Sequence, residues 1–204
     1  LQAWLDAPPE ADALLHSLGA HLHLHAIELV AVALAAAVET DPMVGRVVAW
    51  LQAPVGGSRP TLGLALAAVQ ALGIAASPAV VVEGRAREAG LLALDSDLET
   101  SRRPLPEQAL HVPLPLVLTL MEGRARWPGV ELADADPPPA VASLIAAAER
   151  QARALADGAL AVRAGHPNVA RAAAARLAHA LGRRAAYFER EVPRGAGLWA
   201  TLHG

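Results

Sequence analysis

Apolar residues recur at helical spacing along the N-terminal part of this chain and predict a series of short helices. The strongest pattern runs from Ala26 to Val38, where apolar residues cover more than one face, so we expect this helix to be buried at the centre of a core. Asp41 caps a second helix, Met43 to Gln52, and Thr61 caps a third, Leu62 to Leu72. Three helices in quick succession predict a helix-turn-helix layout.

Shorter elements are predicted on both sides of these helices. A leading helix runs from its cap at Asp6 to Gly19, and a fourth helical segment runs from 79 to 89. The apolar runs 90–95 and 108–112 predict the strands of a β-hairpin with a long polar tip, and Leu114 to Met121 predicts a closing helix. Helices followed by a hairpin are typical of a winged-helix domain.

Charge and proline content indicate a second domain. Residues 1–136 carry 8 arginines and 16 acidic residues, whereas residues 137–204 carry 9 arginines and 4 acidic residues. The boundary coincides with Pro137, Pro138 and Pro139, which neither continue a helix nor join the interior of a sheet. We therefore predict a winged-helix-like domain over 1–136, a linker at 137–139 and a second module over 140–204.

The second module has the order helix, strand, loop, helix, strand. An amphipathic helix is predicted at 140–156, a buried strand at 159–163, an alanine-rich helix at 169–181 and a second strand at 185–188, whereas 127–136 is predicted to be a loop. The predicted fold class is mainly α with small β. It consists of a helical domain with a hairpin, followed by the start of an α/β module.

The loop between the first strand and the helix lies where a phosphate-binding loop would lie. Residues 165–172 read Gly-His-Pro-Asn-Val-Ala-Arg-Ala, in the frame of the Walker A pattern and of its Gly-Pro-Pro-Gly form in AAA+ ATPases. Ala170 stands in place of the second glycine, Arg171 in place of the lysine and Ala172 in place of the magnesium-binding hydroxyl residue, so hydrolysis here is not expected. An ordinary β-α-β crossover is the alternative interpretation. The candidate nucleotide-binding residues are Gly165, Pro167, Asn168, Ala170 and Arg171.

The composition bears on disulfide bonds, membrane insertion and cellular location. There is no cysteine, and all 17 basic residues are arginine. The longest apolar run, Leu29 to Val38, is too short to span a bilayer, so we expect a soluble, cytoplasmic protein without a membrane partner. The first residue is Leu1 and no signal peptide is visible, so we also expect the chain to be part of a longer protein.

Three histidines alternate at His21, His23 and His25, and on a strand their side chains would share one face, as metal ligands do. No cysteine or acidic residue is close enough in sequence to complete a site. We therefore interpret the segment as a solvated connector and predict no metal site.

Several segments, taken in order, resemble a known family. The chain is similar to bacterial AAA+ ATPases that carry an N-terminal winged-helix variant domain, several of which are encoded with contractile injection systems. The segments that carry the resemblance are 24–29, 38–42, 59–62, 102–105 and 110–123, together with the altered loop at 165–172.

The resemblance implies a non-catalytic N-terminal portion of such an ATPase, a protein-interaction and assembly module. ATP and magnesium would bind in a downstream module, with no cofactor in this chain, because the family places a degenerate nucleotide module before the active one. The expected partners are other proteins or neighbouring subunits, and the parent is expected to be a homo-oligomer. The departures from the motif at Ala170, Arg171 and Ala172 count against nucleotide binding in this chain.

Two other functions remain open from the sequence. A winged helix could regulate transcription by placing its third helix in the major groove, but Leu62 to Leu72 has no basic residue and residues 1–136 have a net charge of −8, so no nucleic-acid partner is expected. A still active P-loop domain would need a magnesium ligand and a Walker B acidic residue, and neither is recognisable. Exposed basic pairs that could contact an acidic partner, or could simply be solvated, are Arg102, Arg103, Arg183 and Arg184.

Overall fold

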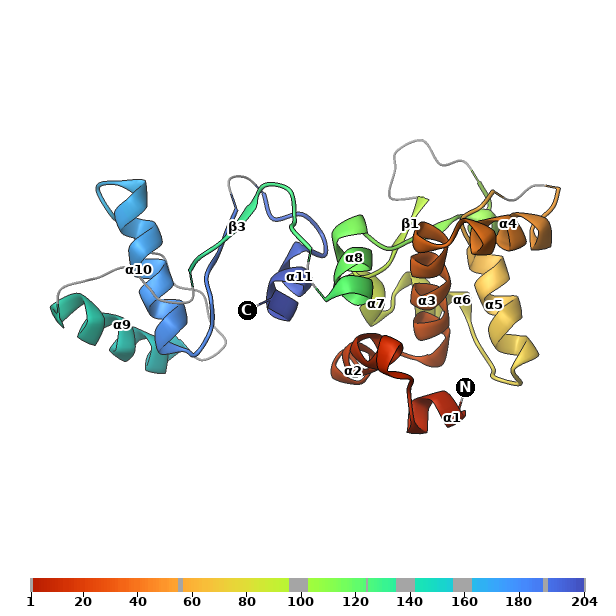
Figure 1. The fold of residues 1–204 in the computed structure, drawn as a ribbon, viewed down its shortest axis with the longest axis horizontal. Helices are drawn as coiled ribbons and strands as arrows, with labels where there is room; N and C mark the ends of the chain where they lie inside the picture. The colour runs from red at the N-terminus through yellow and green to blue at the C-terminus, as the bar shows by residue number, and fades with distance from the viewer. Residues whose placement is uncertain are drawn as a thin grey trace. The chain divides into compact units, whose positions relative to one another are not determined.

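The computed structural model describes residues 2–54, 57–95, 103–123, 125–134, 142–155, 163–188 and 191–203 (Figure 1). The chain divides into two compact units. Unit 1 comprises Leu1–Ala125 and Pro193–Trp199, and unit 2 comprises Arg126–Val192 and Ala200–Gly204. In the described residues both units are mainly helical, and each has one small antiparallel sheet, which confirms the mainly α class with small β.

Unit 1 is organised around one helix, α3 (Ala26–Thr40). The other elements, in chain order, are α1 (Gln2–Asp6), the 3-10 helix η1 (Glu10–Asp12), α2 (Ala13–His21), α4 (Pro42–Leu51), α5 (Leu62–Ala71), α6 (Pro78–Val82), α7 (Arg85–Glu88), β1 (Ala93–Leu94), the 3-10 helix η3 (Leu105–Glu107), β2 (Leu110–His111) and α8 (Leu114–Glu122). The elements packed against α3 include α2, α4, α5, α6, α8 and β2. Ala31, Val32 and Ala35 are fully buried on α3, so the prediction of a central helix is confirmed.

Side-chain caps start the helices that follow α3. Asp41 Oδ1 accepts a hydrogen bond from Met43 N at 2.7 Å, and Thr61 Oγ1 accepts one from Leu64 N at 3.2 Å. These bonds satisfy amide groups that have no partner within the first turn of a helix. The predicted starts of α4 and α5 are therefore confirmed.

The hairpin is present, although its strands are short. β1 pairs with β2 in antiparallel register, Ala93 opposite His111 and Leu94 opposite Leu110. The same edge continues toward α5, because Leu110 N donates to Pro60 O at 2.8 Å. The predicted polar tip lies largely outside the described residues.

Two predicted helices of unit 1 are divided in the structure. The predicted leading helix does not begin directly after Asp6. Asp6 is instead the last residue of α1, and the 3-10 helix η1 precedes α2. Trp4 Nε1 donates to Asp12 Oδ2 at 2.8 Å and so holds α1 against the start of α2. The segment predicted as one helix over 79–89 forms α6 and α7, with a break at Glu83 and Gly84.

Glu28 contacts the chain at the break between α6 and α7. It lies in the first turn of α3 and is fully buried. Glu28 Oε2 accepts from His25 N at 2.9 Å, and its Oε1 accepts from Ala86 N at 2.8 Å, although Ala86 is 58 residues further along the chain. A side chain at Gly84 would collide with Glu28 Oε1 and Val80 O. One carboxylate thus serves the N-terminal turns of two helices.

The segment Pro193–Trp199 completes unit 1 from the far end of the chain, and no element was predicted there. It contains the first turn of α11 (Ala196–His203), whose later residues belong to unit 2. Trp199 is 2% exposed, and its Nε1 donates to Ala125 O at 3.0 Å. Gly90 has a φ of 72°, and a Cβ there would collide with the backbone of Gly195, so the close approach requires glycine.

Unit 2 contains a two-stranded sheet and a pair of helices. Its other elements are β3 (Val130–Leu132), α9 (Ala142–Leu155), α10 (Pro167–Ala180) and β4 (Ala186–Phe188). α9 packs against α10, and small buried side chains at Ala148, Ala152 and Ala175 let helices approach closely. The predicted helices and the second strand of this module are present.

The sheet of unit 2 differs from the predicted one. β4 pairs with β3 in antiparallel register, with Glu131 opposite Tyr187, so the loop predicted over 127–136 is wrong at 130–132. Of the strand predicted at 159–163, residues 159–162 lie outside the described residues and Arg163 is not in a strand. Val130 to Leu132 was missed because three residues of strand are too few to give a clear alternating pattern.

The units also divide at a different place from the predicted domains. Residues 126–134 belong to unit 2, whereas the predicted first domain extended to 136. The predicted linker at Pro137–Pro139 lies outside the described residues. No helix in the described part of the chain has the length and apolar character needed to cross a membrane.

Candidate functional site

The loop predicted to be a degenerate P-loop is an exposed turn that leads into α10. Gly165, Pro167 and Asn168 are exposed, and Pro167 is the first residue of the helix. The side chain of His166 caps this helix, since its Nδ1 accepts from Asn168 N at 3.2 Å. The imidazole therefore already uses one of the amide groups that a phosphate would need.

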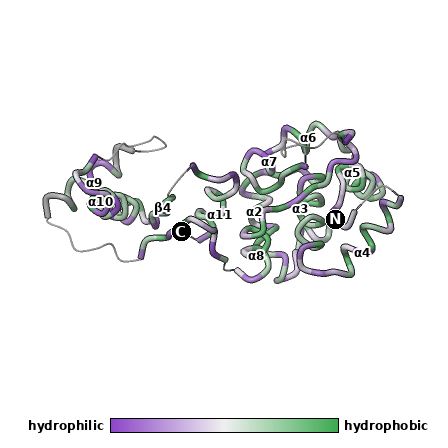
Figure 2. Tube along the Cα trace, turned by 90° about the horizontal axis from the view of Figure 1, so that it is seen from above, coloured by the Kyte–Doolittle hydropathy of each residue, from purple (hydrophilic) through white to green (hydrophobic). Residues whose placement is uncertain are grey.

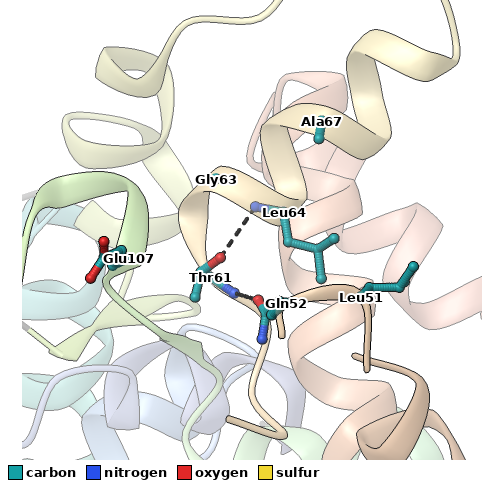
Figure 3. A pocket seen from close by; sticks show the side chains of 7 residues that line it. All are labelled: Leu51, Gln52, Thr61, Gly63, Leu64, Ala67 and Glu107. Carbon is teal, nitrogen blue, oxygen red and sulfur yellow. Dashed lines mark hydrogen bonds between the residues drawn. The ribbon is translucent and has the colours of Figure 1, made fainter. Parts of the chain in front are cut away.

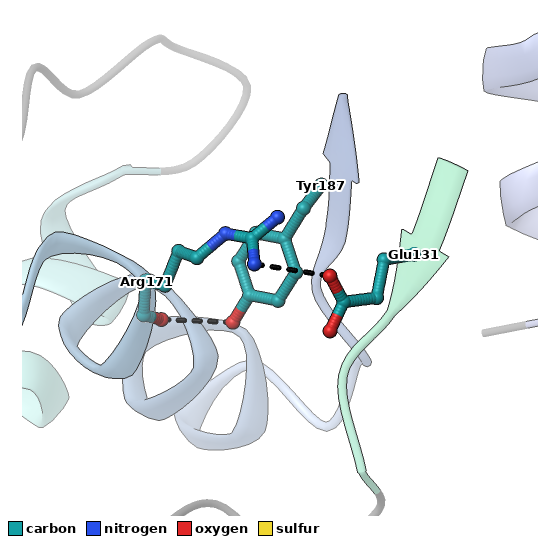
Figure 4. A network of polar contacts seen from close by, with 3 residues as sticks. All are labelled: Glu131, Arg171 and Tyr187. Atoms are coloured by element: carbon teal, nitrogen blue, oxygen red, sulfur yellow. Dashed lines mark hydrogen bonds and ion pairs between the residues drawn. The ribbon is translucent and has the colours of Figure 1, made fainter. Parts of the chain in front are cut away.

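Arg171, which the sequence interpretation aligned with the lysine of a P-loop, faces the sheet of unit 2. Its Nη1 lies 3.0 Å from Glu131 Oε2, and its guanidinium carbon lies 4.6 Å from the centre of the Tyr187 ring. Tyr187 Oη donates to Arg171 O at 2.8 Å, as Figure 4 shows. The cation of Arg171 is thus paired within the unit by an ion pair and a cation–π contact.

A shallow depression of about 320 Å³ lies beside this network. Its polar lining includes the carboxyl groups of Glu131 and Asp134 and the guanidinium of Arg171. A second guanidinium lies next to the depression, because Arg184 Nη2 is 2.8 Å from the carbonyl oxygen of the lining residue Ala133. The two carboxylates and the two guanidinium groups balance, so the described charges give this depression no preference for a nucleotide triphosphate.

The same network predicts an alkaline transition. Burial raises the pKa of Tyr187 above its ordinary value of 10.0, the positive charge of Arg171 opposes the rise, and the negative charge of Glu131 adds to it. A raised pKa in the folded state means that the folded form retains the phenolic proton better than the unfolded form does. The resulting stabilisation is fully present below pH 10 and is lost as the pH rises through the folded pKa.

Tyrosinate absorbance measures this pKa directly, because the chain has one tyrosine and neither lysine nor cysteine. We expect the titration midpoint of the native chain to lie above 10.0, the value for an unperturbed phenol. Arg171→Gln is expected to raise the midpoint further, since the cation that favours tyrosinate is gone. A native midpoint at or below 10.0 would contradict the placement of Tyr187 against α10.

The predicted basic contact residues have different surroundings. Arg102 lies outside the described residues, and Arg103 and Arg183 are exposed. Arg184 is exposed too, but its Nε and Nη2 donate to Ala133 O at 3.1 and 2.8 Å. Arg184 therefore holds the end of β3 within unit 2.

The histidine cluster forms the turn between α2 and α3. His21, His23 and His25 are all exposed, and His23 has a φ of 52°. His25 is the N-cap residue that directly precedes α3. Within the described ranges, no group of three or more His, Cys, Asp or Glu residues is arranged to hold a metal ion.

A different surface is unusual for its apolar character, namely the outer face of α4. Met43, Val47, Trp50 and Leu51 are 57%, 52%, 77% and 54% exposed, while Val48 on the opposite face is buried. Their spacing of four, three and one residues places them on one side of a helix. Figure 2 shows the hydrophobic colour along α4. We call Met43, Val47, Trp50 and Leu51 the α4 stripe.

The α4 stripe continues into a pocket. The pocket has a volume of about 290 Å³ and is lined by Leu51, Gln52, Thr61, Gly63, Leu64, Ala67 and Glu107. Figure 3 shows Leu51 on one side and Glu107 of η3 on the other, with Gln52 and Thr61 between them. Leu51 belongs to both features, so the stripe and the pocket form one surface.

The polar groups on the floor of the pocket are already bonded to one another. Gln52 Oε1 accepts from Thr61 N at 2.6 Å, and Gln52 Nε2 donates to Gly57 O and Arg59 O, each at 2.9 Å. Thr61 Oγ1 caps α5. A ligand would therefore meet mainly apolar side chains, and the carboxylate of Glu107 is the charged group that it would meet.

This surface was not predicted from the sequence. The spacing of the four apolar residues on α4 was visible, but a periodic apolar stripe is normally a sign of burial. Only the tertiary packing shows that α4 places Val48 in the core and leaves the α4 stripe outside. Comparison with protein families, with curated proteins and with solved structures found no match.

Proposed function

We propose that this chain is a non-catalytic protein-interaction module in which the α4 stripe and the adjoining pocket bind a partner protein. The observation that carries the proposal is the exposure of four neighbouring large apolar side chains on one helix face. Scattered apolar residues are normal on a protein surface, whereas contiguous ones mark interaction sites. Tryptophan is also enriched among the residues that dominate binding energy, and Trp50 is the most exposed of the four.

The absence of catalysis is part of the proposal, and the arrangement around α10 supports it. Arg171 is paired with Glu131 and stacked on Tyr187, and the histidine cap uses an amide group of the loop. The carboxyl groups of Glu131 and Asp134 line the adjoining depression. Binding a nucleotide would require breaking these contacts.

The parent protein that we propose is an AAA+ ATPase with an N-terminal winged-helix variant domain. The proposal rests on the resemblance of the sequence segments, and the order of helices followed by a short hairpin in unit 1 is consistent with it. ATP and magnesium would then act in a downstream module. Intact Walker A and Walker B motifs further along the same polypeptide would support this assignment, and an unrelated domain there would overturn it.

DNA regulation is less well supported as a second candidate. α5, the helix that would read the major groove, contains no arginine or lysine, and its Leu62, Ala65 and Val69 are buried. Phosphate neutralisation supplies much of the affinity of DNA-binding proteins. The surface of α5 offers no cation for it.

A peptide display library of random 16-residue segments, selected against the whole chain, tests the proposed function. We expect the retained peptides to bind Trp50→Asp at least about tenfold more weakly, because the charge would have to be buried against the peptide. Met121→Asp is the matched control, since Met121 is 58% exposed on α8 and lies outside the α4 stripe. Retained peptides that lose affinity equally for both variants, or a library that yields no binder, would contradict the proposal.

A further inference from the structure

We infer that the partner of the α4 surface is an amphipathic helix that places one large apolar side chain in the pocket and a lysine or arginine beside Glu107. This inference rests on the proposed function and specifies the chemistry of its ligand. The shape of the surface, the chemistry of the pocket and the distribution of charge all favour such a partner.

The shape of the surface favours a helix. The exposed residues run from Met43 to Leu51, about 12 Å at 1.5 Å per residue, which is a little over two helical turns. Side chains at this spacing form a ridge, and a ridge packs into the groove between the side-chain rows of a second helix. A helical partner would contact this ridge through apolar residues on one of its own faces.

The pocket at the end of the ridge accepts one large side chain. Its volume of about 290 Å³ exceeds the roughly 150 Å³ of an engineered cavity that holds benzene. Leu51, Leu64 and Ala67 supply apolar walls, and the polar groups of Gln52 and Thr61 are occupied by bonds within the unit. An aliphatic or aromatic side chain would therefore enter without leaving these polar groups unpaired.

Charge identifies the polar part of the ligand. Glu107 is exposed at the edge of the pocket, and the structure gives its carboxylate no hydrogen bond or ion pair within the described residues. The nearby Arg59 is already paired with Glu39, with its Nη2 3.0 Å from Glu39 Oε1. Unit 1 has 8 arginines against 13 acidic residues, a formal charge of −5, so a cationic segment is attracted at long range as well.

Arg46 determines at which end of the partner helix a basic residue is favourable. It lies on α4 one turn before Trp50, in the half of the ridge that is farther from Leu51 and the pocket, with its Nη1 3.7 Å from Met43 Sδ. A cation on the partner is favourable beside Glu107 and unfavourable beside Arg46. The surface therefore fits a helix with its basic residue at the pocket end and not a uniformly polycationic ligand.

The peptides retained by the display selection provide the test. We expect them to be enriched in lysine and arginine close to one large apolar residue. Glu107→Gln should weaken their binding about three- to fivefold at low salt and reduce its salt dependence, and Glu107→Arg should weaken it at least about tenfold. Fluorescence anisotropy with a labelled retained peptide measures both effects. Glu122→Gln, an exposed charge removal on α8, should change neither.

The outcomes separate this inference from the proposed function. Retained peptides that depend on Trp50, but lack basic residues and bind Glu107→Gln as well as the native chain, would overturn the inference and leave the interaction module standing. Sedimentation analysis of the chain alone tests whether a second copy of this chain binds the α4 surface. Self-association that Trp50→Asp abolishes would show that a second copy binds there, which would also overturn the inference.

Discussion

Replacing Glu28 with alanine is expected to lower the free energy of unfolding of unit 1 by about 3–6 kcal/mol, because each of two hydrogen bonds to a charged group contributes about 1.5–3 kcal/mol. Both bonds end on backbone amides, His25 N at the start of α3 and Ala86 N in α7. Glu28 is fully buried, so water does not replace the lost acceptor. Such a loss is a large part of the roughly 5–15 kcal/mol that stabilises a typical domain.

Glu28→Gln makes the test specific. The amide side chain has about the same size but offers one oxygen acceptor in place of two, so we expect about half of the loss, roughly 1.5–3 kcal/mol. Urea unfolding followed by circular dichroism measures the difference. Glu122→Ala is the control, because Glu122 is exposed at the end of α8 and surface changes usually cost less than about 0.5 kcal/mol. Equal stabilities of Glu28→Ala and Glu122→Ala would show that Glu28 does not join the two helices.

Trp199→Ala is the second change with a large expected effect, about 3–5 kcal/mol, because it leaves a large cavity in unit 1. Trp199 is 2% exposed, and its indole nitrogen donates to Ala125 O at 3.0 Å. Removing the ring also leaves this carbonyl without its indole donor. Trp199→Phe retains most of the buried area and should cost less, mainly the hydrogen bond and the smaller ring.

Trp50→Ala is the matched control for this measurement, since it removes the same side chain from a position that is 77% exposed. We expect it to change stability by less than about 0.5 kcal/mol. A fragment ending at residue 136 should show a loss similar to that of Trp199→Ala or larger, because it lacks all of Pro193–Trp199. A fragment as stable as the whole chain would show that unit 1 does not need its C-terminal segment.

Some features of the candidate sites could be predicted from the sequence, and others could not. The turn at Gly165 was located from its spacing, and the sequence already shows that it has no lysine or hydroxyl residue at the positions where a Walker A motif has them. The pairing of Arg171 with Glu131 was not visible in the sequence, because Glu131 is 40 residues away and lies on a strand that was predicted to be a loop. The pocket beside Leu51 was likewise invisible, since its walls come from α4, α5 and η3.

Local chemistry by itself determined most helices of this protein. Apolar periodicity located α3, caps at Asp41 and Thr61 located the starts of α4 and α5, and these signals act within one or two turns of the chain. Only the tertiary structure decided which contacts join distant segments. Glu28 divides a predicted helix by binding Ala86 N, and Trp199 returns to unit 1 from the end of the chain. Such contacts depend on which surfaces meet after collapse, and no local pattern of apolar and polar residues specifies that meeting.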